Sequence, residues 1–147
     1  MIFLDTGFLF AFVSEEDKDH SRVDAVLEEY RGRRLSGIAV TTNHVVAETI
    51  TLCRSKGHRD PKLRHERAVR IGRQLRSGVF GHVHHATPDE EEAAFEYFEG
   101  HPDKDYSFVD CLSFVMMRKL GINEAWAVDS DFTHHGFLVR PGPRPRP

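Results

Sequence analysis

Four acidic residues stand in stretches whose other side chains are typical of a buried core. Asp5 follows the apolar run "IFL", Glu48 lies in "HVVAETITL", Asp110 lies in "FVDCLSFVMM", and Asp129 follows "EAWAV". A buried carboxylate without a partner is costly unless it takes up a proton. A divalent cation such as Mg²⁺ or Mn²⁺ would relieve the repulsion between several of them, and such ions prefer oxygen ligands. The four acids therefore predict a metal centre.

Each acid also has a purely structural interpretation. Asp5 and Asp129 could cap the turns that follow them, Asp110 stands three residues after Ser107 as in a capping box, and Glu48 could pair with a basic neighbour. These roles make each acid tolerable, but they do not explain why two strand ends carry one. We therefore keep both interpretations.

Asp131 competes with Asp129 for the place after the late apolar segment. We favour Asp129 as the ligand because it directly follows that segment, and we assign Asp131 to a supporting position.

Short apolar segments alternate with amphipathic ones along the chain. We expect strands at 2–5, 35–41, 79–86, 124–128 and 137–139, a turn at Thr6–Gly7, and helices at 8–13, 18–30, 43–56, 61–76, 88–99 and 107–120. This alternation predicts a three-layer α/β/α domain with a central parallel sheet of four to five strands. In such sheets ligands bind at the carboxyl ends of the strands, where Asp5 and Asp129 are expected.

The length of 147 residues predicts one domain, which we place at residues 1–140, followed by a disordered tail "PGPRPRP" at 141–147. Cys53 and Cys111 are interpreted as free buried thiols in a reducing compartment. The apolar N-terminal run lacks a preceding basic region and is too short to span a bilayer, so we expect no membrane association and a cytoplasmic location.

Charge is distributed unevenly. The net charge is −3, but the segment Arg54–Arg76 carries nine basic residues against two acidic ones, and Asp89–Asp105 carries eight acidic residues against one basic. Such asymmetry is typical of a surface that meets a polyanion, although two solvated helix faces would look the same.

Four segments together resemble a known family. "FLDTGFLFAF", "TTNHVVAETITL", "DYSFVDCLSFVMMRKLGI" and "AVDSDF" with "HHGF" are similar to the successive acidic motifs of PIN domains, most closely those of VapC-type toxins, the ribonucleases of prokaryotic toxin–antitoxin pairs. The likeness extends from Ile2 to about Val139.

The resemblance implies a metal-dependent ribonuclease in which water attacks the phosphodiester and no side-chain nucleophile is needed. It implies Mg²⁺ or Mn²⁺ held by the catalytic Asp5, Glu48, Asp110 and Asp129, with Thr6, Ser107, Asp131 and Asp105 in secondary positions. The arginine-rich helix, through Arg64, Arg67, Arg70 and Arg73, is then expected to hold the RNA backbone. The family also implies a homodimer and inhibition by a small antitoxin protein.

Other functions stay open on the sequence. A non-catalytic PIN-like domain would bind RNA or protein, and a housekeeping PIN nuclease would share the same acids. The histidines of "HVHH" and "HH" could bind zinc or copper, or serve a histidine-based ribonuclease. A haloacid-dehalogenase-type phosphatase would need an aspartate where Gly7 stands, and a receiver domain would need a lysine near Val128.

Overall fold

Five parallel strands form one sheet in the computed structural model, which describes residues 1–147. The strands are β1 (Ile2–Leu4), β2 (Ala39–Thr42), β3 (His82–His84), β4 (Glu124–Ala127) and β5 (Leu138–Pro141), in the order β3-β2-β1-β4-β5. β1 occupies the centre, where Phe3 pairs with Val40 on one side and Leu4 with Trp126 on the other. This arrangement confirms the expected parallel α/β sheet.

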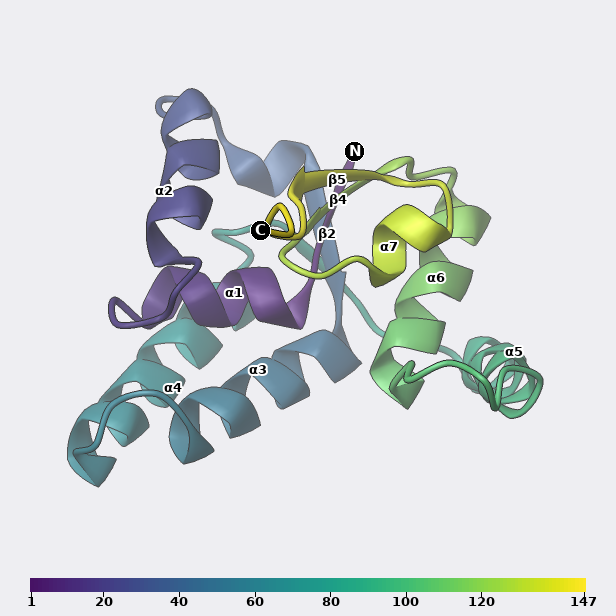
Figure 1. Ribbon diagram of the computed structural model, residues 1–147, viewed down its shortest axis with the longest axis horizontal. Coiled ribbons are helices and arrows are strands. Elements are labelled where there is room, and N and C mark those ends of the chain that lie inside the picture. Colours follow the sequence, from purple (N-terminus) through teal and green to yellow (C-terminus); the bar gives the residue numbers. More distant parts are fainter.

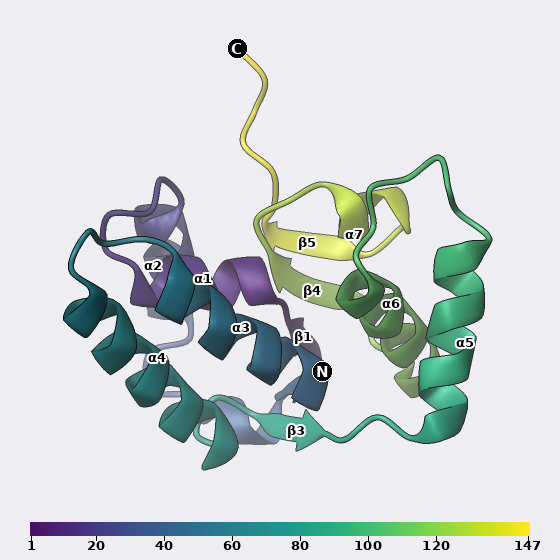
Figure 2. The same ribbon diagram turned by 90° about the horizontal axis from the view of Figure 1, so that it is seen from below.

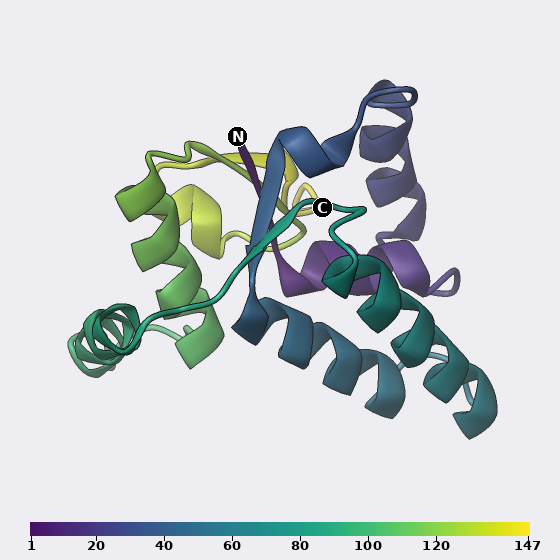
Figure 3. The same cartoon turned by 180° about the vertical axis from the view of Figure 1, so that it is seen from behind.

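Helices cover both faces of the sheet. They are α1 (Thr6–Val13), α2 (His20–Glu29), α3 (Asn43–Ser55), α4 (Pro61–Arg76), α5 (Pro88–Glu99), α6 (Phe108–Leu120) and the short α7 (Asp131–His134). Figures 1 and 2 show α1 to α4 on one side of the sheet and α5 and α6 on the other. From behind, α3 and α4 lie side by side along their length (Figure 3).

The central strands are buried on both faces, which is why their sequences are almost continuously apolar. Phe3, Leu4 and Trp126 are each at most 1% exposed. The aromatic ring of Phe8 from α1 packs against Trp126 with the ring centroids 5.2 Å apart. This packing fixes α1 against β4. It thereby helps to fix the end of β1, because α1 begins directly after that strand.

Several expected boundaries were wrong. Residues 35–37 form a 3-10 turn instead of strand, because pairing with β1 begins only at the carbonyl of Ile38. The strand expected at 79–86 is limited to His82–His84, since this edge strand pairs only with β2. Residues 6 and 7 start α1 instead of forming a turn. The other helices agree with the expected limits within about two residues.

The C-terminal residues make specific contacts with α2. β5 ends at Pro141, one residue beyond the domain limit expected from the sequence. Arg22 donates to the carbonyls of Pro141 and Gly142 at 3.1 and 3.0 Å, and Arg144 Nε donates to the buried Asp19 carboxylate at 2.8 Å. The chain is therefore clasped against α2 as far as Arg144.

Both cysteines are free and buried, as expected. Burial raises the pKa of each thiol to about 11. As for membranes, none of the helices combines the length and the apolar character of a bilayer span.

Candidate metal centre at the carboxyl edge of the sheet

The chain reverses its direction of travel across the sheet at β1. It proceeds from β1 to β2 and β3 on one side, then crosses to β4 and β5 on the other. Crevices at the carboxyl ends of strands form at such switch points in open α/β sheets. Figure 1 shows that α1, α3 and α6 all begin near this edge, below the ends of β1 and β2. Asp5 follows β1 here, and Asp129 follows β4 two residues after its last residue.

Asp5 is the most buried of the predicted acids, at 4% exposed. It is the N-cap of α1, and its Oδ2 accepts a hydrogen bond from the Gly7 backbone N–H at 3.0 Å. Burial, with the neighbouring Asp129 and Asp110 carboxylates, raises the pKa of Asp5 well above its usual range. The cap alone would lower the pKa, so the environment strongly disfavours the ionised form.

Asp110 lies in the first turn of α6, where the expected capping box is present. Its Oδ2 accepts from the Ser107 backbone N–H at 2.8 Å, and Ser107 Oγ accepts from the Asp110 N–H at 3.0 Å. Burial raises the pKa of Asp110 to about 6 against these bonds, with Asp129 and Asp131 contributing. The Asp110 carboxylate thus caps α6 and at the same time lies where its ionised form is disfavoured.

Asp129 and Asp131 are joined through the turn after β4. Asp129 Oδ1 accepts from the Asp131 backbone N–H at 2.9 Å, which confirms the capping interpretation for this acid too. Burial and the Asp131 carboxylate raise the pKa of Asp129, while the bond from the Asp131 N–H lowers it. Asp131 begins α7 and is half-buried.

Glu48 differs from the other three. It is half-buried on α3, and its carboxylate forms no hydrogen bond or ion pair, so the basic partner considered from the sequence is absent. Glu48 does not appear among the charges that raise the pKa of Asp5, Asp110 or Asp129. The structure thus brings three of the four predicted acids into mutual electrostatic range.

The oxygen donors of these residues are of the type that a divalent cation prefers, but their present arrangement does not enclose one. No three His, Cys, Asp or Glu side chains converge closely enough to enclose an ion. However, Asp5, Asp110 and Asp129 each accept a backbone hydrogen bond through one carboxylate oxygen, and their like charges lie near one another. The buried Thr6 Oγ1, next in sequence to Asp5, has no hydrogen-bond partner. Excess negative charge and an unpaired buried hydroxyl are what a cation with its water shell would satisfy.

The remaining predicted helpers lie in different settings. Ser107 is the exposed N-cap of α6, and Asp105 is exposed in the loop before it. The histidines of "HVHH" and "HH" form no group that could hold a metal. Instead, His84 Nε2 bonds to the buried Glu90 carboxylate at 2.9 Å, and His135 contacts the Tyr97 hydroxyl at 3.2 Å.

The four arginines predicted to bind RNA do not share one exposed face. Arg67 is buried, 8% exposed, and its Nη1 bonds to Glu16 at 2.5 Å. Arg64 donates to three backbone carbonyls, those of Arg54, His58 and Arg59. Arg70 and Arg73 are exposed and form no ion pair. The partner of Arg67 lies in the loop between α1 and α2, which helical spacing could not reveal.

Comparisons with known proteins agree with this architecture. A family model described as "PIN domain" matches residues 2–138. The 23S rRNA-specific endonuclease VapC20 of Mycobacterium tuberculosis H37Rv is 37% identical over 143 residues, covering 96% of this chain and 99% of the relative. VapC20 of strain CDC 1551 gives the same values. The crystal structure of M. tuberculosis VapC20, described as a Sarcin-Ricin loop cleaving toxin, matches with a TM-score of 0.81 at 36% identity, over 96% of this chain and all of that one.

Proposed function

The chain belongs to the PIN-domain family, and we propose that it is a Mg²⁺- or Mn²⁺-dependent endoribonuclease that acts as the toxin of a toxin–antitoxin pair. The observation that carries this proposal is the cluster of Asp5, Asp110 and Asp129 at the switch point of the sheet, where burial raises the pKa of each and the Asp129 and Asp110 carboxylates raise that of Asp5 further. Perturbed titratable groups of this kind concentrate at functional sites. The similarity to VapC20 extends over nearly the whole chain, which supports the same reaction class.

Asp5, Asp110 and Asp129 would hold the metal, with Glu48 reaching in from α3. A bound ion would supply an activated water and stabilise charge on the phosphate. The backbone hydrogen bonds to Gly7, Ser107 and Asp131 fix the orientation of the three aspartates. Ser107 and Asp131 are therefore positioning residues in this proposal. Thr6 would offer a hydroxyl to the water shell, and Asp105, exposed in the loop before α6, would be a secondary acid.

The same edge of the sheet suits an RNA phosphate. Three helices, α1, α3 and α6, begin there, and the N-terminus of a helix carries a partial positive charge. Bound phosphate would therefore face backbone N–H groups as well as the metal. The scissile bond would be hydrolysed by a water activated at the metal, so that no side-chain nucleophile is required.

RNA contacts beyond the scissile phosphate are proposed for Arg70 and Arg73, whose guanidinium groups are free. Arg67 is withdrawn into its ion pair with Glu16, and Arg64 is held by carbonyls, so both have a structural role first. VapC20 is named for 23S rRNA and for the Sarcin-Ricin loop. We accordingly propose a structured ribosomal RNA loop as the substrate class of this chain.

The remaining parts of the proposal concern partners and location. A toxin of this family would act in the cytoplasm, would be held inactive by a small antitoxin protein, and would form a homodimer. Mass measurement of the purified chain by light scattering tests the dimer, and inhibition of cleavage by the product of a neighbouring small reading frame tests the antitoxin.

The central test is cleavage of total RNA by the purified chain. The expected result is discrete cleavage with Mn²⁺ or Mg²⁺, none in excess EDTA, and recovery when metal is restored. Asp5→Asn should abolish cleavage and keep the fold, because asparagine can still cap α1 through its side-chain oxygen.

Asp24→Asn is the matched control, since Asp24 is an exposed acid on α2 away from the site. It should cleave like the unaltered chain. Full activity in EDTA would overturn the metal mechanism and favour a histidine-based ribonuclease. Tight RNA binding without cleavage under any metal would favour a non-catalytic PIN-like domain.

A further inference from the structure

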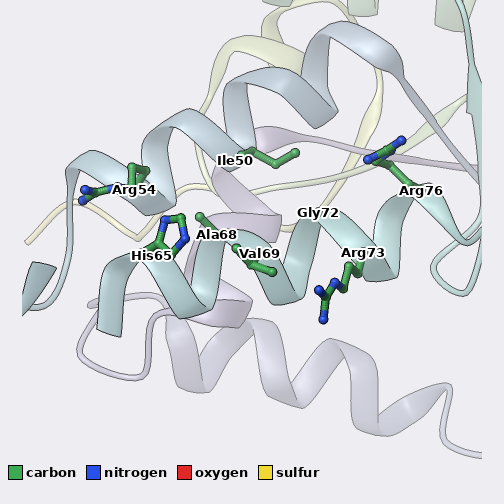
Figure 4. A pocket seen from close by; sticks show the side chains of 8 residues that line it. All are labelled: Ile50, Arg54, His65, Ala68, Val69, Gly72, Arg73 and Arg76. Atoms are coloured by element: carbon green, nitrogen blue, oxygen red, sulfur yellow. The ribbon is translucent and has the colours of Figure 1, made fainter. Parts of the chain in front are cut away.

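A groove separates the exposed sides of α3 and α4. It has a volume of about 460 Å³, within the usual range of ligand pockets, and is shown in Figure 4. Its lining residues come from both helices: Ile50, Arg54, His65, Ala68, Val69, Gly72, Arg73 and Arg76. None of the acids of the candidate metal centre is among them, so the α3–α4 groove is a separate feature.

The floor of the α3–α4 groove is apolar. Ile50 from α3 meets Ala68, Val69 and Gly72 from α4 there. A Cβ atom at position 72 would lie 2.9 Å from Ile50 Cδ1, so any side chain there would have to displace Ile50. The glycine thus allows the two helices to approach closely. Val69 remains 37% exposed on this floor, which leaves apolar surface available to a ligand.

The rim of the α3–α4 groove is basic and uncommitted. Arg54, Arg73 and Arg76 are exposed and form no ion pair, whereas Arg67 on the same helix is paired with Glu16. Two neighbouring cavities along α4 share His65 with this groove, and Glu66 is the only acid that lines them. Three free guanidinium groups therefore surround an apolar floor.

We propose that the α3–α4 groove is an RNA-binding exosite that takes an unpaired nucleotide of the substrate, with its base on the apolar floor and the flanking phosphates on Arg54, Arg73 and Arg76. This inference rests on the proposed ribonuclease function. Guanidinium groups bind phosphate in a fork and stack on bases, and RNA is recognised mainly through unpaired bases in loops. An inorganic phosphate would use the rim alone and leave the floor exposed.

The first test measures RNA binding in a catalytically inactive Asp5→Asn background. The probe is a fluorescent RNA hairpin with an eight-nucleotide uridine loop, titrated at several salt concentrations. Replacing Arg54, Arg73 and Arg76 together by glutamine should weaken binding about tenfold or more and lower the salt slope by about 2, since each phosphate contact on a single strand contributes about 0.7. The matched control replaces Arg33, Lys56 and Arg59, which are exposed basic residues outside the groove, by glutamine.

The second test addresses the base. The same hairpin with an abasic loop should bind the Asp5→Asn protein several-fold more weakly than the uridine loop. Val69→Ser, which removes apolar surface without changing charge, should reduce that preference and leave the salt slope unchanged. Circular dichroism melting confirms that each variant is folded.

The possible outcomes separate the exosite from the proposed function. Equal losses in the groove and control triples, or equal binding of the two loops, would overturn the exosite. Preferential binding of poly-L-glutamate would do so too and would identify a docking site for an acidic protein. In the catalytically active chain, the groove triple should raise KM for hairpin cleavage and leave kcat unchanged. An absence of cleavage by the unaltered chain would instead contradict the proposed ribonuclease.

Discussion

The acid cluster (Asp5, Asp110 and Asp129) and the α3–α4 groove both gather like charges, but they do so under opposite conditions. Asp5 is buried and Asp110 and Asp129 are half-buried, and this burial raises the pKa of each. The arginines of the groove are exposed, so water and salt screen their repulsion. Charge of one sign is therefore most costly where solvent is excluded. The two proposed occupants follow from this contrast: a compact cation for the acid cluster and an extended polyanion for the groove.

The largest expected effect concerns which acid after β4 is the ligand. Asp129→Asn should lower the cleavage rate by about 100-fold or more, as expected for loss of a metal ligand in a hydrolytic site. Asp131→Asn should have a smaller effect, about tenfold or less, because the Asp131 backbone N–H that orients Asp129 is kept and only the neighbouring negative charge is removed. Single-turnover cleavage of one RNA at saturating Mn²⁺ measures both. A larger loss of rate in Asp131→Asn than in Asp129→Asn would identify Asp131 as the metal ligand and Asp129 as the supporting residue.

Metal binding should stabilise the acid cluster and leave the groove unaffected. At a metal concentration 100-fold above the Kd, Mg²⁺ or Mn²⁺ should add about 2.7 kcal/mol to the free energy of unfolding, because only the folded chain holds the site. Asp5→Asn should lose most of this gain, while the groove triple should keep it. Urea titration with and without metal measures the effect. A gain that survived in Asp5→Asn would place the cation elsewhere.

The metal-free protein should become less stable as the pH rises from about 4 to above 6. The folded pKa values of the three aspartates lie above their unfolded values, so the folded chain binds more protons and each upward step in pH costs stability. The slope is at most about 1.4 kcal/mol per pH unit for each proton released. Unfolding in EDTA measures it, and Asp110→Asn should flatten the slope near pH 6.

Glu90 changes the stability with pH in the opposite direction and limits the pH range in which the acid cluster can be studied. Its ion pairs with Lys119 and His84 lower its pKa to about 2 although burial opposes them. Its contribution is therefore present at neutral pH and is lost as the pH falls from about 4.5 towards 2. Between pH 5 and 7 His135 contributes a slope of the opposite sign, because burial lowers its pKa. The difference between the unaltered chain and Asp110→Asn in this window therefore isolates the acid cluster, and a steeper fall of stability with pH in the variant would contradict the like-charge account.

Two similar capping boxes, in α5 and α6, allow the effect of a cap on stability to be separated from its effect on the orientation of Asp110. Ser107→Ala in α6 and Thr87→Ala in α5 each remove a cap hydroxyl and should each lower stability by about 1 kcal/mol. Only Ser107→Ala should also slow cleavage, because it alone loosens the turn that holds Asp110. Denaturant titration and cleavage rates measured on both variants provide the comparison. Equal cleavage by the two would exclude a positioning role for Ser107.

The smallest effect is expected at the groove. Arg76→Gln should change the free energy of unfolding by less than about 0.5 kcal/mol, since its side chain is exposed and unpaired. Arg67→Gln should cost about 1 to 3 kcal/mol, because it leaves a buried hydrogen bond unmade. Thermal melting of both variants measures the contrast. A large loss in Arg76→Gln would mean that the groove serves the fold.

The sequence predicted the fold and the acids better than it predicted the basic surface. The apolar runs before Asp5 and Asp129 indicate that these strands are buried and that the two acids lie at their carboxyl ends. Both inferences depend only on the local sequence pattern and on the direction of the strand. The fate of Arg67 depends on Glu16, a loop residue brought near only by the fold. The groove depends on Gly72 facing Ile50 across two helices, and no local pattern encodes that pairing. Helical spacing therefore grouped Arg64 and Arg67 with residues that have a different role.

The central place of β1 in the sheet has a consequence for how the protein is made. Asp5 is synthesised among the first residues, but its strand acquires its second neighbour only when Leu4 can pair with Trp126. At typical rates of synthesis, roughly 6 to 25 s pass between the addition of residue 5 and that of residue 129. During that interval the nascent chain holds Asp5, and later Asp110, without Asp129. The proposed metal site therefore stays incomplete until most of the chain has been translated.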